Sequence, residues 1–269
     1  MNKTINSPDK KYSAPALEKG LDILELLSSE EVGLSLSAIA KALSRSVGEI
    51  FRMLAVLEQR GYVAQDTSSG CYLVTTFLFE LAHRLPTIRR LTAVAAPQMQ
   101  ILAREILQSV HLGIITNNEV LVVGQTDSPT ANVMSLRLGA KIDPWSASSG
   151  RVIMAFLPKD ELMLLFKEAP LPPEISREEI ERDLKKIREL GHEVRASFIV
   201  RGVMNISAPI INHSGVAIAA LTVPYIKRRD DPVSFEKCKI KLVQAARELS
   251  IALGARQIEQ AFEKTNPPE

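Results

Sequence analysis

The segment LSLSAIAKALSRSVGEIFRMLAVLEQRGYVAQDTSSGCYLV, residues 34–74, decides the fold of the first part of the chain. Leu36, Ile39 and Leu43 share one face of a short helix, and Ser35 is a suitable N-cap for it. A second helix follows after a few residues, and an alternating segment around an Asp/Ser/Gly turn then indicates a β-hairpin. The segment therefore predicts two helices separated by a tight turn, followed by a hairpin.

The second of these helices has a defined start and a defined buried face. Ser46 and Glu49 match the capping-box pattern S-x-x-E, so the helix is expected to begin at Val47. Four apolar residues then recur at i, i+3, i+4 and i+7 and should face a core, namely Ile50, Met53, Leu54 and Leu57. A third apolar stripe precedes the segment, formed by Leu17, Leu21, Leu24 and Leu27. The order of elements predicts a winged helix-turn-helix domain over residues 14–75, with two helices, a tight turn, a third helix and a hairpin.

The rest of the chain mixes helical and strand patterns. Residues 76–96 predict a connector helix with breaks at Pro86 and Pro97. Within residues 97–269, the strand-like segments are VHLGIIT, EVLVVGQ, VMSLRLGAKI, MNISAPIIN and VAIAALTVPY. Helices are expected over 150–157, 160–167 and 177–190, and from 232 into the 260s. These patterns predict an α+β domain with a mainly antiparallel sheet.

Composition narrows the class of protein. Apolar residues make up 46 % of the chain and charged residues 24 %, which is typical of a soluble globular protein. No apolar run reaches the roughly 20 residues that span a membrane, and residues 1–13 lack the apolar core of a secretory signal, so we expect a mobile arm there. Cys71 and Cys238 lie far apart, which argues against a disulfide framework or a zinc site and favours the cytoplasm.

Four segments carry a resemblance to a known family. Residues 34–74 resemble the DNA-binding domain of the IclR-type bacterial transcription regulators. GAKIDPWSASSGRVIMAFLP, GHEVRASFIVRGVMNISAPI and GVAIAALTVP resemble the landmarks of that family's effector domain, in the same order. The resemblance covers roughly residues 14–265. It implies a winged helix-turn-helix, a linker helix, a GAF-like effector and oligomerisation domain, homodimers or dimers of dimers, and control of catabolic genes by small metabolites, often carboxylates.

The helix from Val47 is the predicted DNA-reading helix, because the N-terminal part of the second helix of a helix-turn-helix enters the major groove. Gly48 would let the backbone approach DNA, and Arg52 would contact a guanine or a phosphate. Phe51 is assigned to core packing in preference to a thymine methyl contact. The alternative is that the exposed face of this helix, with Arg45 and Arg52, is an ordinary solvated surface without a binding role. The predicted DNA-binding residues are Lys10, Lys11, Arg45, Ser46, Gly48, Glu49 and Arg52.

The charge of this domain predicts weak binding by one copy. Up to Val74 the chain has eight Lys and Arg residues against nine Asp and Glu residues, and the wing carries Cys71 and Leu73 where the family often has basic residues. Phosphate neutralisation supplies most non-specific affinity for DNA. We therefore expect salt-sensitive binding that needs two domains on a palindromic operator.

The predicted effector site combines a loop and two strands. The loop WSASSGRVIMAF leads from serine hydroxyls into a helix start, which is a natural anion site, although one serine could simply cap the helix. Asn205 stands where many family members have Cys, and a buried amide needs partners, from a ligand or from the sheet itself. Trp145 is either a wall of the site or a core anchor. Arg195 is expected to point outward as a surface residue, and the alternative is that it points inward and pairs with an anionic effector. The predicted effector residues are Trp145, Ala147, Ser148, Ser149, Gly150, Arg195, Asn205, Ser207 and Thr222.

Catalysis is the least favoured function. The four histidines show no metal-binding spacing, and G-x-S-x-G, P-loop and GxGxxG motifs are missing from the sequence. We expect no metal, no cofactor, no membrane partner and no enzyme activity. The partners expected are operator DNA, a small organic acid and further copies of the chain. The open alternative is a DNA-binding protein whose second domain serves only for assembly.

Overall fold

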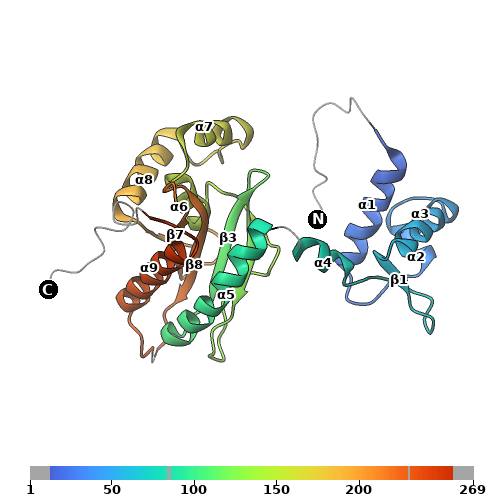
Figure 1. The fold of residues 1–269 in the computed structure, drawn as a ribbon, viewed down its shortest axis with the longest axis horizontal. Coiled ribbons are helices and arrows are strands. Elements are labelled where there is room, and N and C mark those ends of the chain that lie inside the picture. Colours follow the sequence, from blue (N-terminus) through green and yellow to red (C-terminus); the bar gives the residue numbers. More distant parts are fainter. Residues whose placement is uncertain (1–12, 84–85, 230, 257–269) are drawn as a thin grey trace. The chain divides into compact units, whose positions relative to one another are not determined.

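The computed structural model describes residues 13–83, 86–229 and 231–256 (Figure 1). The chain divides into two compact units, residues 1–86 and 87–269, and each unit has its own hydrophobic core. Among the described residues, no helix combines the length and the apolar character needed to span a membrane. Lys10, Lys11 and most of the predicted N-terminal arm lie outside the described residues.

The first unit is a winged helix-turn-helix, as predicted. Its elements are α1 Pro15–Ser28, α2 Leu36–Ala42, α3 Val47–Gln59, β1 Val63–Gln65, β2 Tyr72–Val74 and α4 Phe77–His83. β1 and β2 form an antiparallel hairpin. The helix starts are also as predicted, because Ser35 and Ser46 both accept a hydrogen bond from the third residue of their helix. Ile23, Ile39, Ile50 and Leu54 are fully buried at the centre of the unit.

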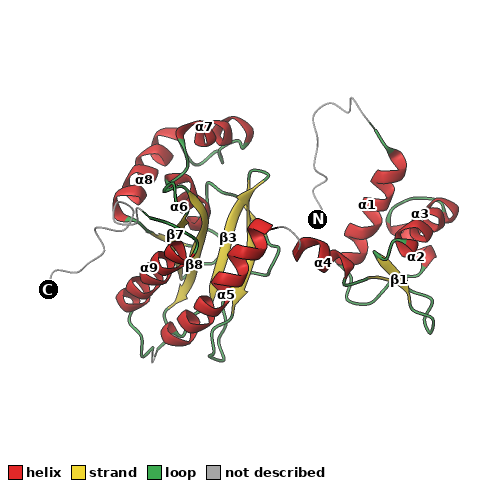
Figure 2. Ribbon diagram, in the orientation of Figure 1, coloured by secondary structure: helices red, strands yellow, loops and turns green. Residues whose placement is uncertain are grey.

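The second unit is an α+β domain built on an antiparallel sheet (Figure 2). The strands are β3 Val110–Thr116, β4 Glu119–Thr126, β5 Lys141–Ile142, β6 Glu193–Ala196, β7 Val203–Ile211 and β8 Ala217–Ile226. They follow the order β5-β4-β3-β8-β7-β6, and every neighbouring pair is antiparallel. The helices are α5 Pro86–Ile106, α6 Ser148–Ala155, α7 Lys159–Glu168, α8 Arg177–Leu190 and α9 Phe235–Ala252.

Helices cover both faces of this sheet. α5 and α9 lie along one face (Figure 2), and α6 packs against β3, β7 and β8. The alternation of β3 shows that α6 lies on the other face. A side chain at Gly113 would meet Ser149 of α6, whereas a side chain at Gly124 would meet both Leu112 and Met99 of α5. Successive residues of a strand point to opposite faces, so the two helices sandwich the sheet.

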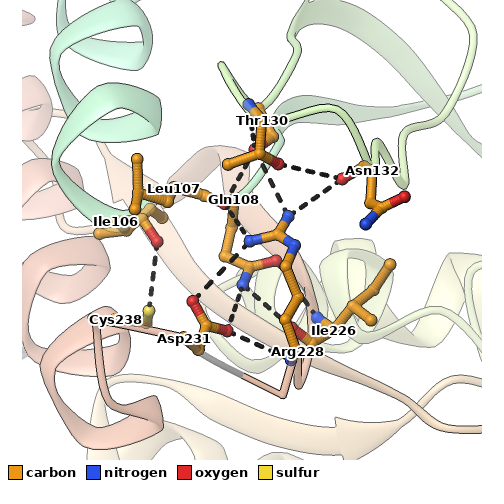
Figure 3. A network of polar contacts seen from close by, with 10 residues as sticks. Ile106, Leu107, Gln108, Thr130, Asn132, Ile226, Arg228, Asp231 and Cys238 are labelled. Atoms are coloured by element: carbon orange, nitrogen blue, oxygen red, sulfur yellow. Dashed lines mark hydrogen bonds and ion pairs between the residues drawn. The ribbon is translucent and has the colours of Figure 1, made fainter.

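A buried polar network fixes the turn between α5 and β3 to the end of β8 (Figure 3). Gln108 donates Nε2–H to the carbonyl of Ile226 over 3.0 Å and accepts from its backbone N–H over 3.2 Å. Arg228 donates to the carbonyl of Leu107 over 2.6 Å. Asp231 accepts a hydrogen bond from Gln108 and lies 3.8 Å from the Arg228 guanidinium. These contacts hold the end of α5 rigidly to the sheet.

Three local expectations differ from the structure. α5 runs through Pro97 without a break, although a proline inside a helix removes one backbone hydrogen bond. Only Lys141–Ile142 of the segment VMSLRLGAKI is a strand, because pairing with β4 is confined to these two residues. α9 ends at Ala252, and residues 257–269 lie outside the described part of the chain.

Candidate DNA-binding helix and effector pocket

The start of α3 is fixed by a capping box. Ser46 Oγ accepts from the backbone N–H of Glu49 over 3.4 Å, and Glu49 Oε2 accepts from the backbone N–H of Ser46 over 3.2 Å. Lys19 of α1 also lies 2.5 Å from the Glu49 carboxylate. The hydrogen bonds from Lys19 and Ser46 lower the pKa of Glu49 to about 2. Glu49 therefore orients α3 against α1, and its carboxylate is already engaged.

Four of the seven predicted DNA-binding residues are exposed on α3 or just before its start. Arg45, Ser46, Gly48 and Arg52 are all exposed. Nothing lies within 4 Å of the position that a Gly48 side chain would occupy, so the first turn of α3 is open to a large partner. Arg52 donates Nε–H to the carbonyl of Gly48 over 3.3 Å, which holds its guanidinium along the same face.

Phe51 corrects one expectation. Its side chain is 53 % exposed, so it does not pack in the core as predicted. Ile50 and Leu54 are fully buried and fill the contact of α3 with the core. The residue next to Ile50 lies about 100° further around the helix, which turns Phe51 away from that core.

A small pocket lies in the second unit, where the start of α6 meets the sheet. Its volume is about 40 Å³, enough for no more than a few water molecules. Apolar residues close it, among them Met134, Leu136, Phe198 and Ile199. The described residues that line it include no Asp, Glu, Lys or Arg. Its polar lining comes from His111, Ser148, Ser149, Ser197, Asn205 and Thr222.

Two buried polar atoms at this pocket have no hydrogen-bond partner. Neither the buried Ser148 hydroxyl nor the buried His111 Nδ1 has a partner in hydrogen-bonding geometry, although the Ser148 hydroxyl lies near enough to Glu193 to help lower the pKa of that carboxyl. Burial lowers the pKa of His111 to about 4, so its imidazole is neutral at pH 7. An unpaired buried polar group costs about 1–3 kcal/mol. The pocket thus presents hydrogen-bonding capacity that the protein itself does not satisfy.

A row of polar side chains crosses the sheet beneath α6. Glu193 of β6 lies opposite Ser207 of β7, Ser207 lies opposite Thr222 of β8, and Thr222 lies opposite His111 of β3. Directly opposed residues share one face of a sheet. The Ser207 and Thr222 hydroxyls are hydrogen-bonded over 2.8 Å, and all four side chains are at most 9 % exposed. The row forms a polar floor under the pocket in an otherwise apolar layer.

An ion-pair network anchors α6 beside this row. Arg151 is fully buried, donates Nε–H to Glu193 over 2.8 Å and forms a close ion pair with Asp183 of α8. Burial raises the pKa of Glu193, and the Arg151 guanidinium acts in the opposite direction. Arg151 therefore keeps a buried carboxylate paired one helical turn beyond Ser148.

The structure brings together five of the nine predicted effector residues. Ala147, Ser148, Ser149, Asn205 and Thr222 line the pocket. Ser207 lies beneath it and reaches it through Thr222.

The other three predicted effector residues do not line this pocket. Trp145 is fully buried, donates to the carbonyl of Ala169 and stacks on Phe166, so it is a core anchor. A side chain at Gly150 would overlap the carbonyl of Pro144. The expectation that Arg195 points outward is wrong: it lies opposite Asn205 on the same face of the sheet, where its guanidinium is 3.8 Å from Asp183 of α8.

Sequence reasoning missed several residues of the site. His111 and Arg151 stand in apolar segments, and a polar residue inside such a segment is the signal that could have identified them. Phe198 and Ile199 join the pocket from an irregular segment after β6, which has no sequence periodicity.

Comparison with known proteins matches both units. A model described as the IclR helix-turn-helix domain matches residues 16–67, and one described as the bacterial transcriptional regulator IclR C-terminal domain matches residues 85–251. The HTH-type transcriptional regulator XynR of Escherichia coli is 27 % identical over 247 residues, covering 89 % of this chain and 97 % of that protein. That name points to a regulator rather than to an enzyme.

Solved structures share the fold over most of the chain. The Thermotoga maritima IclR structure has a TM-score of 0.73 and 26 % identity, and the match covers 88 % of this chain and 98 % of that one. An IclR homolog from Microbacterium hydrocarbonoxydans, complexed with 4-hydroxybenzoate, has a TM-score of 0.74 and 22 % identity over the same shares of the two chains.

Proposed function

Because the chain belongs to the IclR family of bacterial transcriptional regulators, we propose that it binds an operator through α3 and that a small organic acid in the α6 pocket changes its affinity for DNA. We propose that it acts in the cytoplasm, as a homodimer or dimer of dimers, on genes for catabolism of that acid. The observation that carries the effector site is the pair of unpaired buried atoms, Ser148 Oγ and His111 Nδ1, in one pocket.

The chemistry of the pocket supports an acid of modest size. Hydroxyl groups, the Asn205 amide and the backbone N–H groups at the start of α6 can donate to a carboxylate. The complex of the homolog with 4-hydroxybenzoate shows that a protein of this fold binds a carboxylic acid. Since the pocket is only about 40 Å³, the segment with the exposed Phe198 and Ile199 side chains must move outward to admit such a ligand.

A short structural route leads from the pocket to the end of α5. His111 lies near the start of β3, five residues after the end of α5. The Gln108 and Arg228 network fixes that turn to the sheet. A ligand that displaces His111 therefore acts on α5, the helix of this unit that follows the DNA-binding unit in sequence.

Thermal unfolding with paired ligands tests the effector site. Acetate, pyruvate, benzoate and 4-hydroxybenzoate are each compared with their amides, and unfolding is followed by the fluorescence of Trp145, the single tryptophan. An acid that raises Tm should lose this effect in Ser148→Ala and in Asn205→Ala. Ser214→Ala, in the exposed β7–β8 turn, is the matched control and should keep it. A Tm increase that survives both pocket variants contradicts the assignment.

Operator binding is tested with the full chain. Duplexes selected from a random library should be palindromic and should bind with strong salt dependence, and Arg52→Ala should reduce the slope of log affinity against log salt by about 1 if Arg52 contacts a phosphate. Tight, salt-insensitive binding by one isolated first unit would contradict the requirement for two copies.

A further inference from the structure

Phe51 and Val47 form an apolar surface on α3 that the core of the unit does not use. Val47 is 50 % exposed and Phe51 is 53 % exposed, although the same helix fully buries Ile50 and Leu54. Burying a phenylalanine side chain is one of the larger gains that a core residue can give. The fold forgoes this gain at Phe51, so the exposed ring needs another explanation.

The position of this surface excludes α1 as its cover. Glu49 marks the side of α3 that faces α1, since it pairs with Lys19. Phe51 is two residues further along and therefore lies roughly 160° around the helix from Glu49. Val47 precedes Phe51 by four residues, which places the two side chains next to each other on one flank. Gly48 leaves the surface beside them open.

We propose that Phe51, flanked by Val47, contacts the C5-methyl group of a thymine in the major groove and is a specificity-determining residue of this regulator. The proposal rests on the DNA-binding role of α3. The thymine methyl is the apolar group of the major groove, and phenylalanine is among the side chains that contact it. Arg52 lies on the same helix and Arg45 directly precedes its N-cap, Ser46. Both cations are exposed, so this flank faces a polyanion more readily than it faces an apolar protein partner.

An apolar contact has a different salt signature from a phosphate contact. Phosphate contacts release counterions and set the slope of log affinity against log salt, whereas a methyl contact releases none. Phe51→Ala should therefore weaken operator binding equally at every salt concentration. The first unit is not net basic, and such a contact would supply part of its affinity for DNA independently of salt.

Operators with thymine replaced by deoxyuridine test the contact, because this replacement removes only the methyl group. The full-length protein first selects operators from a random duplex library, and affinity is then measured by fluorescence anisotropy at several salt concentrations. At one thymine position in each half-site, removal of the methyl group should lower the affinity about four-fold. Phe51→Ala should lose affinity on the thymine operator, keep its salt slope and no longer distinguish thymine from deoxyuridine at that position.

Val56→Ala is the matched control, because Val56 is equally exposed but lies roughly 140° around α3 from Phe51. It should leave affinity and thymine discrimination unchanged. The proposal is overturned if every thymine tolerates deoxyuridine, if Phe51→Ala still discriminates as the wild type does, or if Phe51→Ala changes the mass of the free protein in sedimentation, which would place Phe51 between copies. Selection that enriches no DNA would instead refute DNA binding itself.

Discussion

Replacing Arg151 by methionine removes the cation that pairs with Glu193 inside the second unit. Arg151 is fully buried and Glu193 is only 9 % exposed, so water cannot replace the lost partner. Asp183, the other partner, is 31 % exposed and can be hydrated. The variant therefore strands one buried carboxylate.

Breaking a buried ion pair from one side costs about 3–5 kcal/mol. For a unit of this size each kcal/mol moves Tm by about 2–4 °C, so Arg151→Met should lower Tm by roughly 6–20 °C. Trp145 is the single tryptophan and lies fully buried in this unit, so its fluorescence reports the unfolding of this unit alone. Lys141→Met is the control, since Lys141 and Glu119 are both exposed and their pair should contribute about 1 kcal/mol or less.

The loss should depend on pH in a defined direction. Burial already raises the pKa of Glu193, and removing Arg151 raises it further. In the variant the pKa of Glu193 is higher in the folded state than in the unfolded state. The folded state therefore binds the proton more tightly, and the free energy of unfolding falls as pH rises. The difference between wild type and Arg151→Met should therefore be larger at pH 8 than at pH 5. A loss below 1 kcal/mol, or a loss independent of pH, would refute the reasoning.

Three further variants test other parts of the structure. Ser207→Ala should cost about 1–3 kcal/mol by stranding the buried Thr222 hydroxyl, whereas Ser207→Ala with Thr222→Val should be close to wild type in denaturant unfolding. The free energy of unfolding of the wild type should fall by about 3 kcal/mol as pH falls from 6.5 to 4, because the His111 imidazole is protonated in the unfolded chain but stays neutral in the folded one, where its pKa is about 4. His111→Gln should lack this part of the pH dependence when unfolding is followed by the fluorescence of Trp145. Gly48→Ala should stabilise the first unit by about 0.5–1 kcal/mol, measured by circular dichroism of the helices, because the new methyl group meets no protein atom. The same variant should weaken operator binding measured by fluorescence anisotropy, because the methyl group would meet DNA.

Local sequence signals were sufficient for the elements of the first unit. Ser35 and Ser46 cap α2 and α3 as predicted, because capping involves only residues three positions apart. The apolar spacing of α3 also identified its buried residues. Phe51 was assigned wrongly, since spacing alone does not show that Ile50 and Leu54 already fill the core.

The pocket needed the tertiary structure. Ser148, Asn205 and Thr222 were predicted one by one, but their meeting with His111 depends on strand register.

The sequence by itself determined the winged helix-turn-helix, the four long strands of the second unit and the loop that starts α6, because each depends on neighbouring residues, whereas the short strand β6 carried no such signal. Only the tertiary structure decided that Glu193, Ser207, Thr222 and His111 form one polar row, and that Arg151 is buried against Glu193. The physical reason is the period of two in a strand: a shift of one residue in the pairing of β3 with β8 would turn His111 to the opposite face and remove it from the pocket.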